Sequence, residues 1–272
     1  MALSASPEKI RVTLDGTELS LERTGRGPPI LLVHGLGGPA MWERVVPLLG
    51  DRCETIVPHL PGFGESPPPG RPFRAEDHAQ LLARLLDEVD LRGVTVAGTS
   101  YGGEIAALLA VSRPDRIEAL VLICPTGTRR HAVLLRAPML RKALRRLLRN
   151  MLPNRRIAEA LSRSSFHDVS SRPPGLVDRY LEHLGRPGNL ECLVWAVTDI
   201  WSRGDRLPGI IRGLAFPVRV VWGGNDRTIP PNRAASLERA GDHVRTIILE
   251  GCAHSVALEK PDELSRIILP KV

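Results

Sequence analysis

The sequence predicts an α/β protein whose core is a mostly parallel, doubly wound sheet of about eight strands. Three observations support this prediction: a hairpin pattern near the start, several short runs that are apolar on both faces, and helical stretches between those runs. The chain has 272 residues, of which 43% are hydrophobic and 25% are charged. This is an ordinary globular composition, which excludes disordered, collagen-like and coiled-coil chains. The length favours one large domain with an insertion.

The first predicted element is a β-hairpin. Residues 10–14 and 19–23 form two short runs of alternating hydrophobicity, and Asp15-Gly16 lies between them. Asp-Gly is one of the strongest turn signals for two adjacent antiparallel strands. We therefore expect an antiparallel pair at the beginning of the sheet.

Six further runs are apolar on both faces, which is typical of parallel strands covered by helices on both sides. These runs are residues 30–33, 55–57, 94–97, 119–123, 218–222 and 246–249. Between them, the stretch 76–89 repeats leucine and valine at helical spacing, and the stretch 104–111 is small and apolar. We predict that these two stretches are crossover helices.

The alternation of strands and helices stops between residues 124 and 216. This region contains arginine-rich helical stretches and two tryptophans, but no convincing buried strand. We therefore predict a helical cap, residues 126–213, inserted after the sixth strand. The core domain then consists of residues 1–125 and 214–272.

One helix of the predicted cap should begin near Pro138, because proline suits the first turn of a helix. At about 100° per residue, the apolar and basic side chains of this helix separate onto two faces. The apolar face carries Leu140, Leu144, Leu147, Leu148 and Met151, and the basic face carries Arg141, Lys142, Arg145, Arg146 and Arg149.

Positive charge is concentrated in the same region. The net charge of the chain is +7, but residues 119–158 contain ten basic residues and no acidic one, which leaves −3 for the rest. No motif for nucleic-acid recognition accompanies these residues, so no nucleic-acid partner is expected. Three interpretations of the basic face stay open. It is a solvated surface, a dock for an acidic partner (an acyl carrier protein, coenzyme A or a carboxylate-bearing substrate), or an attachment site for an anionic membrane surface.

Other signals bear on cofactors and location. The cysteines are far apart and form no CxxC pair, so we expect buried free thiols and no metal site. No flavin or nicotinamide motif is present, and therefore no cofactor is implied. No apolar run is long enough to cross a membrane, and the first ten residues lack a signal pattern, so we expect a cytoplasmic protein without an integral membrane segment. The cysteines are Cys53, Cys124, Cys192 and Cys252.

A strand, a sharp turn and a helix are predicted around the sequence Gly98-Thr99-Ser100-Tyr101-Gly102. A serine at such a turn adopts an unfavourable backbone conformation that exposes its hydroxyl above the sheet. Glycines two residues before and after the serine remove side chains that would clash there. Ser100 is therefore a candidate nucleophile.

This pattern resembles the α/β-hydrolase superfamily, in its capped esterase-like or lipase-like branch, over about residues 8–270. A second motif, His34-Gly35-Leu36-Gly37-Gly38, follows the strand at 30–33, where the family provides an oxyanion-hole donor. The resemblance implies that the backbone N–H groups of Leu36 and Tyr101 would stabilise the negative oxygen of a tetrahedral intermediate. The family-like loop at 59–66 carries His59 where the family usually has an acidic residue, and we interpret this loop as structural.

A serine nucleophile needs a base, and the base needs a group that orients it. Asp226 follows the strand at 218–222 and His254 follows the strand at 246–249, in the order serine, acid, histidine expected for the family. All three residues follow the carboxyl ends of parallel strands, where the sites of open α/β sheets gather. We therefore predict a triad of Ser100, Asp226 and His254. The other histidines, which we expect to be solvated, are His78, His131, His167, His183 and His243.

The predicted reaction is hydrolysis of a carboxylic ester or related acyl substrate through an acyl-enzyme. The resemblance also implies alternatives with the same triad, namely a carbon-carbon bond hydrolase, a thioesterase, or a natural-product cyclase or lyase. A non-catalytic ligand-binding module on the same fold is a further alternative. Candidate substrate-binding residues are His34, Met139, Leu140, Trp195 and Trp201.

Overall fold

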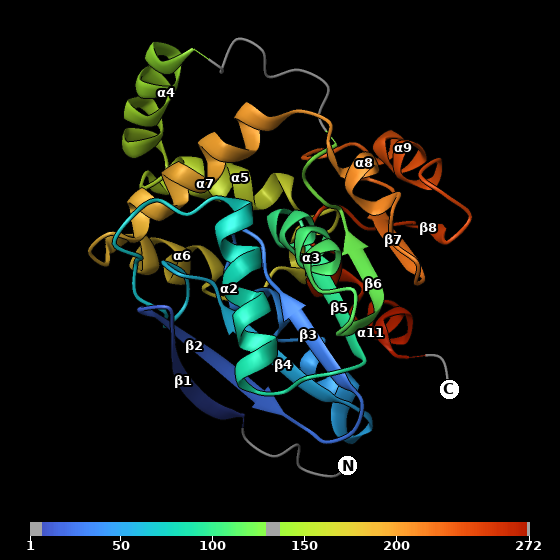
Figure 1. Cartoon of the computed structure of the whole chain (residues 1–272). Helices are drawn as coiled ribbons and strands as arrows, with labels where there is room; N and C mark the ends of the chain where they lie inside the picture. Colours follow the sequence, from blue (N-terminus) through green and yellow to red (C-terminus); the bar gives the residue numbers. More distant parts are fainter. Residues whose placement is uncertain (1–6, 129–136, 271–272) are drawn as a thin grey trace.

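The computed structural model describes residues 7–128 and 137–270. Its centre is one eight-stranded sheet with the order β1-β2-β4-β3-β5-β6-β7-β8 (Figure 1). All of the predicted strands are present, and the sheet has the predicted number of strands. The strands are β1 (Glu8–Leu14), β2 (Thr17–Thr24), β3 (Pro29–Val33), β4 (Glu54–His59), β5 (Val94–Thr99), β6 (Ile117–Ile123), β7 (Val218–Gly223) and β8 (Val244–Leu249).

The first two strands form the predicted antiparallel hairpin, with Leu14 opposite Thr17. Asp15 and Gly16 at its tip both have positive φ, 48° and 76°, as the favoured two-residue turn requires. β2 is also antiparallel to β4, whereas every other pair in the sheet is parallel. The carboxyl ends of β3 to β8 therefore meet at one edge.

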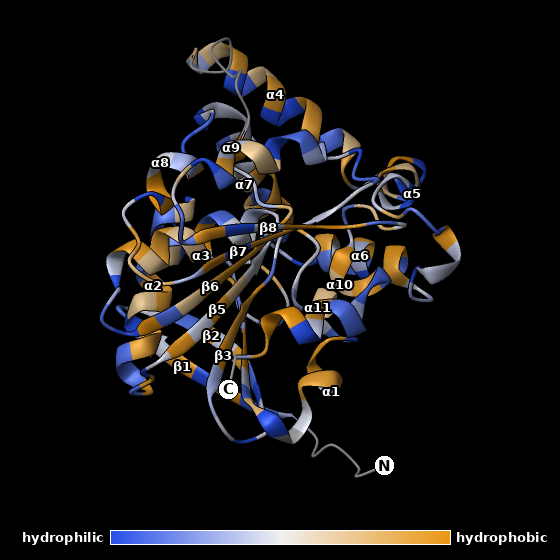
Figure 2. Cartoon of the chain, turned by 90° about the vertical axis from the view of Figure 1, so that its right-hand side faces the viewer, coloured by the Kyte–Doolittle hydropathy of each residue, from blue (hydrophilic) through white to orange (hydrophobic). Residues whose placement is uncertain are grey.

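Helices cover both faces of the sheet, which explains why the central strands are apolar on both sides. Figure 2 shows α2, α3 and α8 on one side of the sheet and α1, α10 and α11 on the other. The helices of the core are α1 (Val46–Leu49), α2 (Ala75–Glu88), α3 (Tyr101–Ser112), α9 (Ala234–Glu238), α10 (Val256–Glu259) and α11 (Pro261–Ile268). Short 3-10 turns are η1 (Pro39–Trp42), η2 (Gly50–Arg52), η4 (Val169–Ser171) and η5 (Pro231–Arg233).

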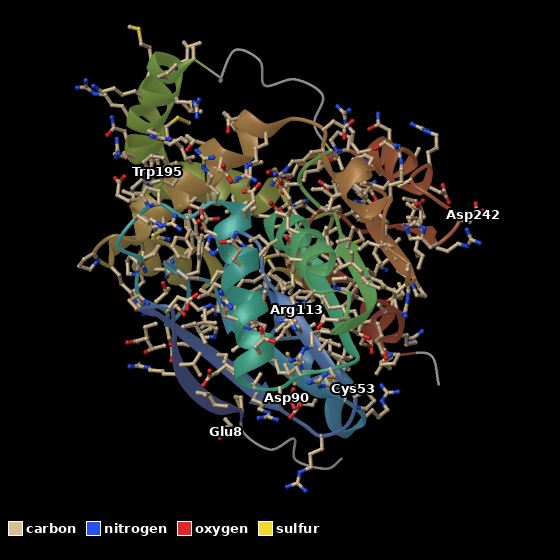
Figure 3. The ribbon with its side chains drawn as sticks, in the orientation of Figure 1. Glu8, Cys53, Asp90, Arg113, Trp195 and Asp242 are labelled. Atoms are coloured by element: carbon tan, nitrogen blue, oxygen red, sulfur yellow. The ribbon has the colours of Figure 1, made fainter. Side chains whose placement is uncertain are left out.

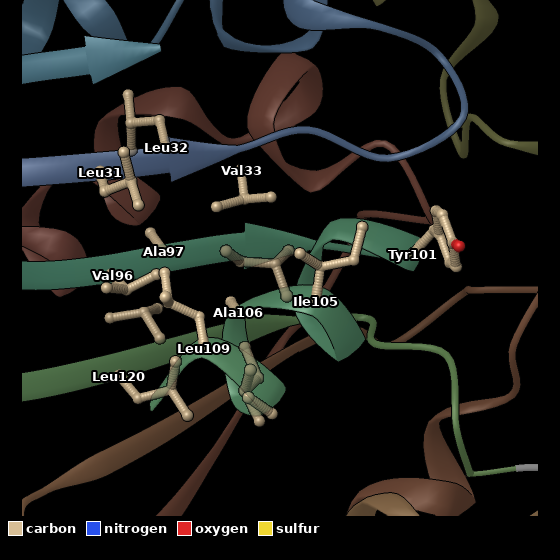
Figure 4. Packing of buried hydrophobic residues seen from close by; sticks show 14 of the residues in the cluster. Leu31, Leu32, Val33, Val96, Ala97, Tyr101, Ile105, Ala106, Leu109 and Leu120 are labelled. Atoms are coloured by element: carbon tan, nitrogen blue, oxygen red, sulfur yellow. The ribbon is translucent and has the colours of Figure 1, made fainter. Parts of the chain in front are cut away.

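The core is densest where α3 packs on the middle of the sheet. Val96 and Leu120 on neighbouring strands pack against Ile105 and Leu109 of α3 (Figure 4). All four side chains are fully buried. Burial of this apolar area, at roughly 25 cal/mol per Å², fixes α3 against β5 and thereby fixes the turn between them.

The segment between β6 and β7 is helical in the described residues, with only an isolated bridge between Thr128 and Asp205. Residues 129–136 lie outside the described part of the chain. They include three of the ten basic residues counted above, Arg129, Arg130 and Arg136, and also His131. The helices are α4 (Pro138–Met151), α5 (Arg155–Ser164), α6 (Leu176–Gly185), α7 (Asn189–Arg203) and α8 (Leu207–Ile211).

The helix α4 begins at Pro138, as predicted, and packs against α7 at one corner of the molecule (Figure 1). Of its predicted apolar face, Leu148 is buried and Leu144 partly so, whereas Leu140 and Leu147 are about half exposed, at 46% and 53%. The surface of α4 thus shows both hydrophobic and hydrophilic residues (Figure 2). In the part of the chain that the structure describes, no helix combines the length and apolarity needed to cross a membrane.

Candidate active site

Ser100 lies in the sharp turn that joins β5 to α3. Its φ of 54° and ψ of −117° are unfavourable for a residue with a side chain, which is the strain expected at such a turn. Three backbone hydrogen bonds hold it there. The N–H of Ser100 donates to Ile123 O (2.8 Å), and its carbonyl accepts from Gly103 N and Thr126 N, both at 3.0 Å.

The glycines around Ser100 are required by close packing of the backbone. A Cβ atom at Gly98 would lie 2.3 Å from the carbonyl oxygen of Gly102, and one at Gly102 would lie 2.3 Å from that of Val33. Both distances are far below a van der Waals contact, so a larger residue at either position would displace the turn. The glycines at positions 98 and 102 are therefore explained by the close backbone packing that the sequence predicted around Ser100.

His254 connects Ser100 to Asp226. Its Nδ1 donates to Asp226 Oδ2 at 2.7 Å, and its Nε2 lies 3.1 Å from Ser100 Oγ, at hydrogen-bond distance. The structure thus brings together the three residues predicted as a triad. With Nδ1 protonated, Nε2 is free to accept the serine proton, as a general base must.

Asp226 is 4% exposed, and the hydrogen bonds that it accepts favour its ionised form. Burial raises its pKa, but the hydrogen bond from His254 and those from the backbone of Ile229 (2.9 Å) and Thr228 (2.8 Å) lower it, and the net pKa is below the ordinary value. The aspartate is therefore negatively charged at neutral pH. It can stabilise a positive charge on the imidazole.

The loop that carries His254 is held by Glu259, a residue of the family-like segment after His254 to which the sequence assigned no role. Glu259 Oε2 accepts a hydrogen bond from the N–H of Ala253 (2.8 Å), and its Oε1 accepts from the N–H groups of His167 (2.8 Å) and Asp168 (3.1 Å). One carboxylate thus ties the loop before α10 to the segment between α5 and η4.

The two predicted oxyanion donors flank Ser100. Tyr101 follows it directly, at the start of α3. Leu36 belongs to the turn after β3, and this turn lies against the serine, because a Cβ atom at Gly35 would be 3.1 Å from Ser100 Cβ and 3.7 Å from Ser100 Oγ. The placement of both residues is compatible with N–H groups directed at an oxygen bound beside Ser100.

His34 is fully buried, which differs from its expected place in a substrate pocket. Its Nε2 accepts from Leu60 N at 3.0 Å, and its Nδ1 lies 2.7 Å from Gly35 O. Burial lowers its pKa to about 3, so the ring is neutral. His34 therefore joins the turn after β3 to the loop after β4.

Two more histidines have structural environments. His59 accepts from Glu65 N (3.0 Å) and orders its own loop, in agreement with a structural role. His78 was expected to be solvated, and this is wrong: it is 2% exposed. It packs edge-on against Phe73 and Tyr101, and burial lowers its pKa to about 4.

The other predicted substrate-binding residues lie on α4 and α7. Met139 is 84% exposed at the start of α4, and Leu140 is half exposed beside it. Trp201 is 36% exposed on α7. Trp195 lines a cleft of about 710 Å³ between the start of α2, α4 and α7, whose wall does not include Ser100, Asp226 or His254.

Cys124 is a further residue of the site and follows β6 directly. Its sulfur, a carboxylate oxygen of Asp226 and a ring nitrogen of His254 all lie within 4.8 Å of one another. Burial, and then the charge of Asp226, raise the pKa of the Cys124 thiol well above its ordinary value. A neutral thiol is a poor metal ligand, and Asp226 and His254 already bond each other, so this group fits a proton relay better than a metal site.

A buried ionic cluster joins α3 to the helices between β6 and β7. Glu104, with a side chain that is 1% exposed, accepts from Arg206 Nε (2.7 Å) and from Thr126 Oγ1 (2.6 Å). Arg203 of α7 binds Asp199 at 2.7 Å in the same cluster. The hydroxyl of Tyr101 reaches Asp199 at 3.5 Å. The helix that begins next to Ser100 is thus anchored by charged groups.

Comparisons with known proteins agree on one family. The family model described as alpha/beta hydrolase fold matches residues 28–261. A pimeloyl-[acyl-carrier protein] methyl ester esterase of Aeromonas hydrophila is 27% identical over 263 residues, covering 92% of this chain and 97% of that protein. A 2-hydroxy-6-oxononadienedioate/2-hydroxy-6-oxononatrienedioate hydrolase of Cupriavidus pinatubonensis is 28% identical over 261 residues, covering 90% and 87%. A thermophilic esterase from Thermogutta terrifontis, solved with malate bound, has a TM-score of 0.81 and 25% identity, and 96% of each chain is covered.

Proposed function

This chain belongs to the alpha/beta hydrolase fold family, and we propose that it is a serine hydrolase that cleaves carboxylic esters. The observation that carries the proposal is the chain of two hydrogen bonds from Ser100 through His254 to Asp226, at 3.1 and 2.7 Å. Relatives of this chain are named as esterases and hydrolases, which supports an enzyme.

The proposed reaction has two halves. As Ser100 Oγ attacks the acyl carbon, its proton moves to His254 Nε2, and Asp226 stabilises the imidazolium without taking the proton. The N–H groups of Leu36 and Tyr101 hold the oxyanion, and His254 then protonates the leaving alkoxide. In the second half, water attacks the acyl-enzyme, gives its proton to His254, and releases the acid and Ser100.

We assign residues 126–213 to a cap over this site and the remaining residues to the core. Two contacts support the assignment. Ser255, next to the proposed base, donates its N–H to Ser165 O at 2.9 Å, and His183 Nε2 lies 3.2 Å from Gly62 O in the loop after β4. The helices between β6 and β7 therefore bind loops on both sides of the site.

The proposed nucleophile can be tested with short p-nitrophenyl esters and a fluorophosphonate probe. Ser100→Ala should lower kcat/KM by about 10³-fold or more, because the hydroxyl that attacks the acyl carbon is lost. Ser112→Ala, at the exposed end of α3, is the matched control and should keep full activity. Equal activity of Ser100→Ala and wild type, or no probe adduct on Ser100, would refute the proposal and favour a ligand-binding module.

A carbon-carbon bond hydrolase is a second candidate, because the Cupriavidus pinatubonensis relative, at 28% identity, is named as a hydrolase of a dienedioate. A more specific version of the carboxylic-ester proposal is that the ester is linked to a carrier protein, because the Aeromonas hydrophila relative is named as an esterase of such a substrate. A panel that contains a vinylogous diketone, a simple ester, a thioester and a carrier-linked ester would separate these substrates by kcat/KM. The basic residues of α4 are the proposed contact for an acidic carrier.

A further inference from the structure

The cleft between the start of α2, α4 and α7 has an excess of positive charge. Its volume of about 710 Å³ is within the range of small-molecule sites. Its wall holds three carboxylates but six arginines, which are Arg71, Arg74, Arg141, Arg145, Arg203 and Arg206.

The carboxylates of the wall are already neutralised by arginines on the α2 and α7 sides. Glu76 pairs with Arg203 at 2.6 Å and with Arg206 at 2.5 Å, and Asp77 pairs with Arg71 at 2.6 Å. The third carboxylate, that of Asp199, pairs with Arg203 in the ionic cluster described above. Arg145 on the α4 side and Arg74 at the approach to α2 take part in none of these pairs.

Arg145 is the best positioned of these cations. Its guanidinium lies 3.3 Å from the ring centre of Trp195, and its Nε donates to Thr198 Oγ1 at 3.4 Å. Trp195 marks this part of the molecule, between α4 and α7, in Figure 3. Among the described residues, no carboxylate lies within ion-pair distance of Arg145 or Arg74.

The surroundings of Arg145 favour an incoming anion. Burial, and then the charges of Arg141 and Arg149, lower the pKa of Arg145 below its ordinary value. The positive charge of Arg145 is therefore destabilised by its surroundings. Stacking on Trp195 holds the planar guanidinium in one orientation, so little side-chain entropy remains to be lost on binding. An anion would therefore gain charge-assisted hydrogen bonds and relieve repulsion at the same time.

We propose that this cleft binds a small organic phosphate, with Arg145 and Arg74 as its phosphate contacts and Phe73 and Trp195 at its apolar walls. The guanidinium fork matches phosphate oxygens, and a phosphate of charge near −2 balances the unpaired cations. A volume of about 710 Å³ is much larger than an inorganic ion needs, which favours an organic molecule of nucleotide size. Because Ser100, Asp226 and His254 are not in the wall, the site does not depend on the proposed hydrolase activity.

Calorimetric titration of the full chain tests the proposal with ADP, coenzyme A and inorganic pyrophosphate as probes. We expect saturable binding of ADP or coenzyme A with a Kd below about 1 mM, and weaker binding of pyrophosphate. The Kd should rise steeply with added salt, because the contacts are ionic. Ser100→Ala should bind as the wild type does, which separates this site from the proposed function.

Two variants on the same helix provide the comparison. Arg145→Gln should weaken binding at least tenfold, whereas Arg146→Gln, at an exposed position outside the cleft, should change the Kd less than about twofold. Arg74→Gln repeats the test on the α2 side if Arg145→Gln does not fold. No saturable binding of any probe, equal losses in the two α4 variants, or pyrophosphate binding as tightly as ADP and coenzyme A would overturn the proposal.

Discussion

Glu259 illustrates how a single side chain positions the candidate site without touching the reacting atoms. Its two carboxylate oxygens accept hydrogen bonds from Ala253 on one side and from His167 and Asp168 on the other. Hydrogen bonds from backbone N–H groups to a carboxylate are stronger than those between neutral groups. The position of His254 therefore depends on this acid.

We expect Glu259→Gln to lower kcat about tenfold with little change in KM. One of the three N–H donors would face the amide NH₂ group instead of an oxygen, and the loop that carries His254 would move. Glu263→Gln, on the exposed side of α11, is the matched control and should keep wild-type kcat. A fall in melting temperature with unchanged kcat would show that Glu259 stabilises the fold and has no positioning role.

The sequence indicates the three triad candidates because each follows an apolar run typical of a parallel strand, and parallel strands end at one edge. It does not indicate the roles of Glu259 and Cys124. Two of the three partners of Glu259, His167 and Asp168, are 92 and 91 positions away, and Cys124 looks like any small apolar residue after a strand. Their relation to His254 and Asp226 arises only from tertiary packing. His78 was misjudged for the same reason, since a polar residue on a helix can still be buried.

At the scale of elements, α3 is held between the sheet and the helices that follow β6. Its apolar side packs on the strands, and Glu104 on its first turn forms the buried ion pair with Arg206. Breaking a buried ion pair is costly because the remaining charge stays out of water.

We predict that Arg206→Met destabilises the protein by about 3 kcal/mol. This is the lower end of the range for breaking a buried ion pair, because Arg203 Nη1 still lies 4.0 Å from Glu104 and partly compensates its charge. Urea unfolding measures the change in the free energy of unfolding. Arg212→Met, at the exposed position directly after α8, should cost less than about 0.5 kcal/mol. A loss below about 1 kcal/mol for Arg206→Met would mean that water or another cation compensates Glu104.

The helix α4 separates what periodicity can predict from what it cannot. The 3.6-residue pattern correctly assigns its start at Pro138 and which residues share a face. It does not tell which face packs inward. Arg145 stacks on Trp195, so part of the basic face turns toward α7 while Leu147 on the apolar face stays 53% exposed. The contact between Arg145 and Trp195 therefore places part of the basic face of α4 against α7, although the other face is more hydrophobic.

At the scale of the whole molecule, two buried histidines make stability depend on pH. Burial lowers the pKa of His34 to about 3 and that of His78 to about 4, against about 6.5 in the unfolded chain. The unfolded chain therefore binds two more protons than the folded one once the pH falls well below 6.5. Stability is full above pH 6.5 and is lost as the pH falls toward 4.

Each histidine should lower the free energy of unfolding by about 1.4 kcal/mol per pH unit in this range. Urea unfolding between about pH 6 and pH 4.5 measures this slope, above the range in which most carboxylates titrate. His78→Leu should reduce the slope by about half, whereas His167→Gln, at the surface, should leave it unchanged. The same slope in wild type and His78→Leu would contradict the assignment.

The overall fold was largely predictable because parallel strands covered by helices leave continuous apolar runs, and the sequence has one such run for each of the six parallel strands, β3 to β8. The hairpin was marked by Asp15 and Gly16. The residues that line cavities were not predictable in this way. Trp195 and Met139 were both predicted to bind substrate, yet one lines an arginine-rich cleft and the other is 84% exposed.

The hydrogen bond between Ser100 and His254 joins positions that are 154 residues apart. The strands that precede them, β5 and β8, are separated in the sheet by β6 and β7. In the native sheet the contact therefore depends on the docking of β7 on β6 and of β8 on β7. The distance between the two side chains thus reports whether the final third of the polypeptide has reached its native place.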